Sequence, residues 1–133
     1  MKSKNLLITA LLSLSGLAFA QGDTFSQAEA SAKKNLMTSE GAAYDRALGQ
    51  TLQASPEFEP RMNKCLAAHP GPQEVHGYFH FTSATAYQVE LQPASSFSDC
   101  VASALEGFLV PPPPTIPYFN HFTFTVVPED GSD

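Results

Sequence analysis

Three of the four histidines could bind a metal or transfer protons if the fold brought them together. His76 and His80 belong to VHGYFHF, which alternates like a β-strand, and His121 lies in a second alternating segment. At ~3.3 Å per residue, His76 and His80 lie about 13 Å apart along a strand, too far to share one ion. His76 or His80 could still lie beside His121 across a ladder, as two of the three or four ligands that a tight site needs. We expect a solvent-facing polar surface here, with no metal and no cofactor.

Nucleophilic catalysis would need a serine or cysteine held against a histidine and an orienting acid. Ser95, Ser96 and Ser98 cluster just before an apolar helical pattern, where helix capping explains them. Ser96 and Asp99 have the spacing of a capping box. The carboxylates have no catalytic partner at a suitable spacing. We therefore expect no catalytic residue and no enzymatic activity, with an exported hydrolase or small-ligand binder on the histidine-bearing face as an alternative.

The first twenty residues have the pattern of a secretory signal peptide. Lys2 and Lys4 precede an apolar run over residues 6–17, and Ala18-Phe19-Ala20 is a cleavage motif of the A-x-A type. The run is too short for a lasting membrane anchor, and no cysteine follows the site to accept a lipid. We expect cleavage near Ala20 and a periplasmic or secreted protein without a stable membrane anchor.

Residues 21–133 carry five basic and thirteen acidic residues, a net charge of −8 with histidine neutral. Binding to nucleic acid or to anionic lipid requires clustered Lys and Arg. The last basic residue of the chain is Lys64, so the C-terminal half offers no such cluster. Nucleic-acid binding is excluded on this ground.

Cys65 and Cys100 are the two cysteines. An even count in an oxidising compartment predicts a disulfide. Free thiols or metal ligands are the alternative, although the chain has no C-x-x-C motif.

The remaining patterns predict helices and strands in a fixed order. Apolar positions at helical spacing predict helices from Asp23 to Leu36, from Thr38 to Leu52, and from about Pro60 to His69. The main helix is predicted to follow a cap at Ser95 or Ser96, and its apolar residues form one stripe. The stripe consists of Phe97, Cys100, Val101, Ala104, Leu105, Phe108 and Leu109.

Three segments alternate as strands: Val75–Phe81, Tyr87–Leu91 and Phe119–Val127. Pro111–Pro114 forms a stiff spacer before the last strand. The predicted fold is α+β, with N-terminal helices followed by β-β-α-β. Its three-stranded antiparallel sheet has the order 2-1-3, with one face on the main helix and the other in solvent. The sheet side of the core is predicted to consist of Phe79, Phe81, Val89, Leu91, Phe122 and Phe124.

The region from Met62 to Val127 resembles the C-terminal domain of the TonB energy-transducer superfamily, including its orphan periplasmic relatives. The matching features are Cys65 in RMNKCL, the YQVELQP strand, the SSFSDCVASALEGF helix, the FLVPPPP exit and the final FTFTV. The resemblance implies a periplasmic interaction module of α-β-β-α-β form that offers the edge of its last strand to a partner. The chain departs from the transducers in having a cleavable signal in place of an anchor, and it lacks their long proline-rich linker.

We therefore expect four parts: a signal peptide (1–20), an N-terminal helical extension (21–56), the TonB-like domain (57–127) and a disordered acidic tail (128–133). The expected function is protein binding, by strand addition at an edge that lacks charged protection. An immunity-type inhibitor of a toxin is a further alternative. The candidate partner-binding residues are Phe119, His121, Thr123, Thr125 and Val127.

Overall fold

The protein is an α+β structure in which three antiparallel strands are packed on helices. The computed structural model describes residues 24–127, so the predicted signal peptide and acidic tail lie outside the described residues. A helix over residues 24–36 comes first. It is followed by α2 (Ser39–Ala54), α3 (Phe58–Ala68), β1 (Gln73–Phe81), β2 (Tyr87–Gln92), α4 (Ser96–Leu105) and β3 (Tyr118–Val126).

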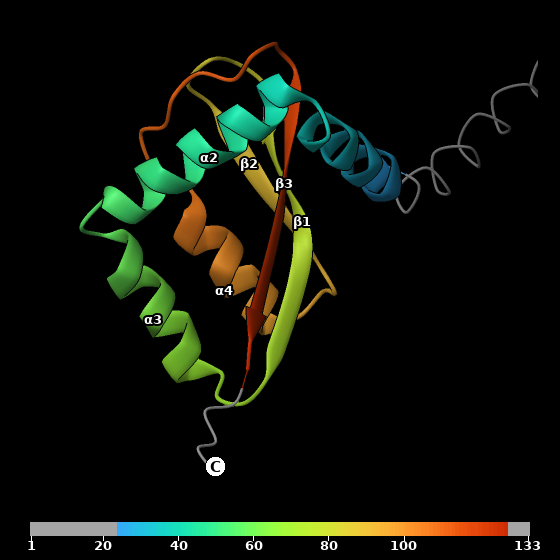
Figure 1. Ribbon diagram of the computed structural model, residues 1–133. Helices are drawn as coiled ribbons and strands as arrows, with labels where there is room; N and C mark the ends of the chain where they lie inside the picture. Colours follow the sequence, from blue (N-terminus) through green and yellow to red (C-terminus); the bar gives the residue numbers. More distant parts are fainter. Residues whose placement is uncertain (1–23, 128–133) are drawn as a thin grey trace, which may run out of the picture.

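The sheet has the order β2-β1-β3, and both neighbouring pairs are antiparallel, as predicted. The central strand β1 pairs Phe79 with Val89 on β2 and with Asn120 on β3. Gly77 on β1 lies where the backbone of β2 comes closest. A Cβ atom at this position would fall 1.8 Å from the carbonyl oxygen of Glu90, so only glycine fits. Both β2 and β3 are edge strands (Figure 1).

Helix boundaries follow the capping residues. The Thr38 hydroxyl accepts the amide of Gly41 at the start of α2, and the Ser95 hydroxyl accepts the amide of Ser98 at the start of α4. Of the two predicted caps for α4, Ser95 is therefore the one used. Helix α3 begins at Phe58, two residues earlier than predicted, which leaves Pro60 within the first turn.

The predicted apolar stripe of α4 is too long at its C-terminal end. The helix ends at Leu105, and Gly107 follows with φ of +84°, a left-handed conformation that ends helices and favours glycine. Phe108 is still buried, from the loop, but Leu109 is 87% exposed. The prediction was too long because it followed the apolar spacing alone and did not use Gly107 as a helix stop.

One core joins the sheet to α2, α3 and α4. The predicted sheet residues Phe79, Phe81 and Val89 are buried in it, and Leu91, Phe122 and Phe124 pack against it while partly exposed. The residues predicted to face them from α4 and its exit are buried too: Phe97, Val101, Leu105 and Phe108. Helix α2 contributes Tyr44, Leu48 and Leu52, so this part of the N-terminal extension shares the core of the β-β-α-β unit.

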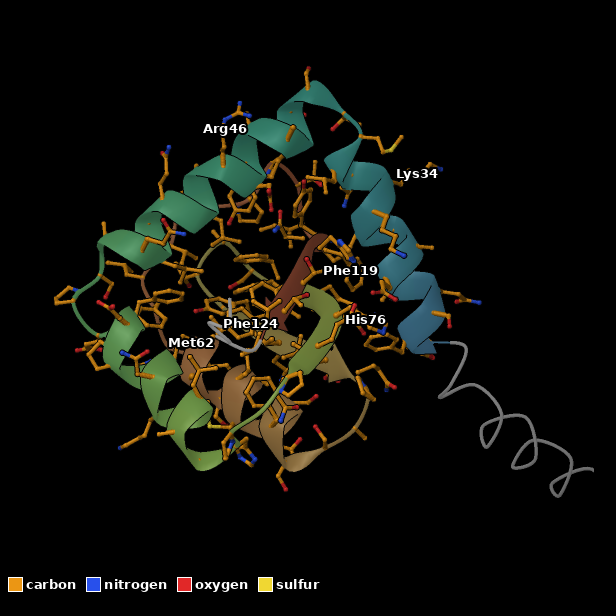
Figure 2. The ribbon with its side chains drawn as sticks, turned by 60° about the horizontal axis from the view of Figure 1, so that its bottom comes forward. Lys34, Arg46, Met62, His76, Phe119 and Phe124 are labelled. Carbon is orange, nitrogen blue, oxygen red and sulfur yellow. A yellow bond between two sulfur atoms is a disulfide. The ribbon has the colours of Figure 1, made fainter. Side chains whose placement is uncertain are left out.

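The prediction that the second face of the sheet meets solvent holds for only part of that face. Glu74, Glu90, Thr123 and Thr125 on it are exposed, but the area around Tyr78 is covered. The helix over residues 24–36 lies on that face, opposite the other helices (Figures 1 and 2). Ala28 and Ala32 pack on Tyr78 of β1, flanked by Phe25 and Phe119. Small alanine side chains bring the helix close to the sheet. The sequence of this face, which contains His76, Tyr78 and His80, predicted exposure to solvent. No local pattern indicated that a helix would cover part of it.

Candidate functional site

The histidine-bearing face contains a cluster centred on Glu29, which sequence reasoning missed. Oε2 of Glu29 lies 2.5 Å from Nδ1 of His76 on β1 and 3.3 Å from Nε2 of His121 on β3. Figure 2 shows His76 and Phe119 between the sheet and the helix over residues 24–36. One carboxylate thus connects that helix to two strands. The signal available in the sequence was an acidic residue directly after Ala28 and three before Ala32, on the apolar face of a helix.

The Glu29 carboxylate is stabilised in its charged form. Burial by itself raises the pKa of Glu29, because it removes water from the charge. Hydrogen bonds from His76 and His121, the charge of His76 and that of Lys33 outweigh this effect. The net result is a pKa of Glu29 below its ordinary value, so the group is ionised at neutral pH.

The third histidine of the candidate set does not join this cluster. The ring of His80 stacks on Phe119 with centroids 4.4 Å apart and an interplanar angle of 19°. Within residues 24–127, no group of three or more His, Cys, Asp or Glu side chains is arranged to hold a metal ion. His80 thus contacts an aromatic ring, whereas His76 and His121 contact Glu29.

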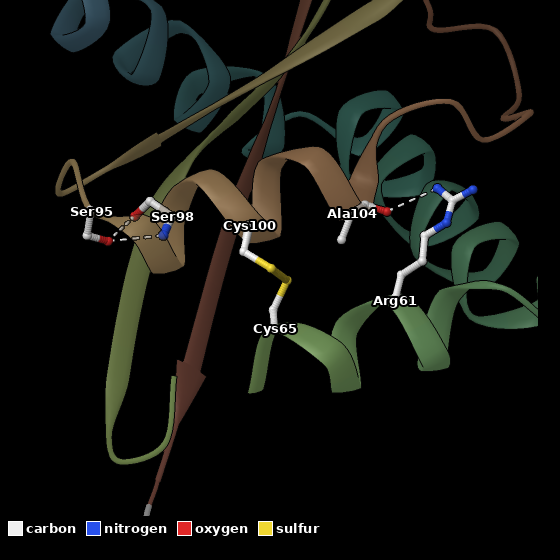
Figure 3. The surroundings of a disulfide bond; sticks show 6 residues. All are labelled: Arg61, Cys65, Ser95, Ser98, Cys100 and Ala104. Atoms are coloured by element: carbon white, nitrogen blue, oxygen red, sulfur yellow. Dashed lines mark hydrogen bonds between the residues drawn. A yellow bond between two sulfur atoms is a disulfide. The ribbon is translucent and has the colours of Figure 1, made fainter. Parts of the chain in front are cut away.

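Cys65 and Cys100 form a disulfide, as predicted. It joins α3 to α4 across a sequence separation of 35 residues, with the two Cα atoms 5.7 Å apart (Figure 3). Disulfides are typical of oxidising compartments. Among the described helices, none is long and apolar enough to cross a membrane.

Polar contacts hold the C-terminal end of α4. Arg61 on α3 donates to the carbonyl oxygen of Ala104 at 3.3 Å (Figure 3). It also donates to the carbonyl oxygen of Glu106 at 3.0 Å, and its guanidinium lies over the Phe108 ring. A cation at this end of a helix complements its dipole. The Tyr87 hydroxyl donates to the carbonyl of Leu105 at 2.7 Å. These contacts connect the end of α4 to α3 and to the edge strand β2.

The serines of the candidate catalytic set are engaged in local structure. Besides the Ser95 cap, the Ser98 hydroxyl donates to the carbonyl of Pro93 at 2.6 Å. Both serines cap the turn that leads from β2 into α4 (Figure 3). No hydrogen bond joins a serine to a histidine among the described residues.

The free edge of β3 is divided into two parts. The carbonyl of Phe119 accepts a hydrogen bond from Asn35 Nδ2 at 2.9 Å, and the carbonyl of His121 accepts one from Asn120 Nδ2 at 3.2 Å. Both carbonyls must therefore point away from β1. Since the direction alternates along a strand, the backbone groups of Thr123 and Thr125 point the same way. They have no hydrogen-bond partner in the part of the chain that the structure describes.

The candidate partner-binding residues thus separate by exposure. Phe119 and His121 are half-buried beneath the helix over residues 24–36, whereas Thr123, Thr125 and Val127 are exposed. The side chains of the threonines lie on the same face of β3 as His121. The accessible edge is the C-terminal half of the strand.

A cavity of about 160 Å³ lies beside this edge, between α2 and β3. Its wall is largely apolar and comes from Leu48, Leu52, Phe58, Phe79 and Phe122. Polar residues line the rest: Asp45, Gly49, Gln53, Asn120 and His121. Asp45 Oδ1 accepts a hydrogen bond from Asn120 Nδ2 at 3.0 Å, which fixes α2 against β3. The sequence offered no sign of this cavity.

Comparisons with protein-family models, with curated proteins and with solved structures found no match to this chain. The resemblance to the TonB C-terminal domain stays a prediction from the sequence.

Proposed function

We propose that this chain is an exported protein-binding domain that pairs with an extended segment of a partner through the free edge of β3. The observation that carries the proposal is the pair of exposed residues Thr123 and Thr125, whose backbone groups point away from the sheet and have no hydrogen-bond partner within residues 24–127. Main-chain hydrogen bonds to such an edge provide affinity in strand addition.

The composition of the edge supports the same proposal. From Gly107 to Pro128 the sequence has no Lys, Arg, Asp or Glu. Edge strands are usually protected from pairing by charged side chains, prolines or covering elements. Asn35 and the helix over residues 24–36 cover the first half of β3 in this way, but the half that contains Thr123 and Thr125 has no such cover among the described residues.

Export is part of the proposal. It is supported by the signal-like pattern over residues 1–20 and by the disulfide, and it makes the periplasm or the exterior the place of action. A TonB-like role as an interaction module, without energy coupling, fits these features. Determining the N-terminal sequence of the exported protein checks this part, and we expect it to begin at Gln21.

The alternative of a hydrolase or small-ligand binder on the histidine-bearing face is not favoured. Helix 24–36 occupies that face, and Glu29 uses two of its histidines.

The edge can be tested without breaking the sheet. The amide of Thr125 points away from β1, so Thr125→Pro removes an outward donor and leaves the β1–β3 ladder in place. Thr125→Val keeps the amide and the shape and serves as the matched control. We expect Thr125→Pro to abolish capture of the partner from a periplasmic extract, and Thr125→Val to retain it. Equal capture by both folded variants would place the binding surface elsewhere.

A further inference from the structure

The cavity beside Phe122 lies where a fourth strand of the sheet would put a side chain. A strand paired with β3 alternates its side chains between the two faces in step with β3. The guest residue opposite Phe122 therefore points to the same face as Phe122, which is the face that the cavity occupies. Pairing along Thr123–Val127 places the next guest residue opposite Phe122 without using the carbonyls of Phe119 and His121, which already accept hydrogen bonds from Asn35 and Asn120.

We propose that this cavity is the anchor pocket for one large apolar side chain, aromatic or branched aliphatic, of a positively charged extended segment in a partner protein. The inference rests on the proposed strand addition and names the chemistry of its partner.

The size of the cavity limits the anchor to one side chain. Its volume of about 160 Å³ is close to that of an engineered apolar cavity of roughly 150 Å³ that binds benzene. A phenylalanine, leucine or isoleucine side chain matches this space, whereas alanine would leave most of it empty. The apolar wall of Leu48, Leu52, Phe58, Phe79 and Phe122 makes a charged anchor costly to bury.

Charge favours basic residues next to the anchor. Asp45 lines the cavity, and Glu74 lies opposite Thr125 on β1, toward the other end of the free edge. No Lys or Arg lines the cavity, and residues 21–133 carry a net charge of −8. In Figure 2, Arg46 points from α2 away from the sheet. A segment with Lys or Arg beside its apolar anchor complements these acids.

Gly49 offers a way to fill the cavity without disturbing the core. It lies inside α2 and lines the cavity, and a Cβ atom at this position would have nothing within 4 Å. Gly49→Leu therefore starts a side chain at the cavity wall and also improves helix propensity. Gly49→Ala adds only a methyl group. Gln50→Leu adds the same leucine one position along, at an exposed site that does not line the cavity.

The test uses a phage-displayed library of random peptides about seven residues long, a typical strand length, selected against the complete exported protein. We expect the selected peptides to share one Phe, Leu or Ile with Lys or Arg nearby, and to lose binding to Thr125→Pro. Gly49→Leu should weaken their binding at least about tenfold, the loss expected for excluding one apolar side chain. Gly49→Ala and Gln50→Leu should change it less than about threefold. Replacing the shared residue of the peptide by alanine should cause the same tenfold loss on the unchanged protein, which tests the pocket independently of any protein variant.

The outcomes separate the two proposals. Peptides that depend on the Thr125 amide but ignore both Gly49→Leu and the loss of their shared residue would overturn the pocket and leave strand addition standing. Peptides that bind Thr125→Pro as tightly as the unchanged protein, or a selection that enriches none, would overturn both. If the protein is a dimer that Thr125→Pro converts to a monomer, a second copy occupies the edge, and the basic partner segment is wrong.

Discussion

A carboxylate oxygen of Glu29 lies 2.5 Å from Nδ1 of His76, so a residue at the start of the described chain contacts the central strand of the sheet. The second contact of the same oxygen, to His121, extends the connection to β3. Helix 24–36 has few apolar contacts of its own with the sheet, chiefly Ala28, Ala32 and Phe25 around Tyr78. Its polar attachment to the sheet consists of the Glu29 contacts and the hydrogen bond from Asn35 to the Phe119 carbonyl.

Glu29→Gln should loosen helix 24–36 without unfolding the domain. Glutamine keeps the size of the side chain but removes its charge, and hydrogen bonds to charged groups contribute about 1.5–3 kcal/mol when buried. Because the His76 side chain is 46% exposed, we expect a loss nearer ~1 kcal/mol. Hydrogen exchange should quicken in residues 24–36 and stay unchanged in β1. Glu74→Gln, on an exposed site of β1, is the control, and equal protection of the helix in both variants would contradict the role of Glu29.

The contribution of Glu29 should disappear in acid. Its pKa is lowered in the folded protein by His76 and His121 against the opposing effect of burial, so its ionised form favours folding. The stabilisation is then complete above the unfolded pKa of about 4.3. It is lost as pH falls through the lower folded pKa. Urea denaturation should show the difference between the unchanged protein and Glu29→Gln shrinking over this acid range. A difference that grows toward low pH would contradict the direction of the pKa shift.

Removing the disulfide should strongly destabilise the domain. The Cys65–Cys100 bond closes a loop of about 36 residues, which the chain-entropy relation values at roughly 4 kcal/mol. Unreduced protein should contain no free thiol by mass spectrometry, and reduction should lower the denaturation midpoint. The double variant Cys65→Ala with Cys100→Ala should be equally unstable with and without reductant. Two alkylatable cysteines in freshly purified exported protein would contradict the bond.

Core phenylalanines should differ in importance according to their burial. Phe79 is 1% exposed, and Phe79→Ala should cost about 3–5 kcal/mol, as expected for a buried phenylalanine. Phe124 is only partly buried at the edge strand, so Phe124→Ala should cost less, about 1–3 kcal/mol. Thermal denaturation of the two variants gives the order. A larger loss for Phe124→Ala would mean that the edge strand is better covered than the described residues indicate.

Tyr87→Phe should destabilise the end of α4. The Tyr87 hydroxyl donates to the Leu105 carbonyl and accepts the amide of Phe108, so its removal leaves two backbone groups without this partner. We expect a loss of about 1–3 kcal/mol. Tyr118→Phe is the matched control, because the Tyr118 ring is buried but its hydroxyl makes no hydrogen bond within residues 24–127. Equal stability of the two variants would show that the Tyr87 contacts contribute little.

The order and type of the elements were determined locally, and the sequence alone predicted them. Apolar positions spaced for a helix over α2 and α4, alternation in β1, β2 and β3, and the even cysteine count each arise within one segment or from composition. The strand order β2-β1-β3 followed as well, since a hairpin and one crossover leave few arrangements. The Cys65–Cys100 bond joins α3 to α4, the helix that packs against β2.

Only the tertiary structure decided what covers the second face of the sheet and which half of the β3 edge stays free. Glu29 meets His76 across 47 positions of sequence, and Asn35 meets Phe119 across 84. Neither pair could be predicted from the spacing of residues within one segment, because a hydrogen bond between distant residues depends on the relative placement of whole elements. The cavity beside Phe122 has the same origin: its walls come from α2, α3, β1 and β3, and its shape exists only once those elements pack together.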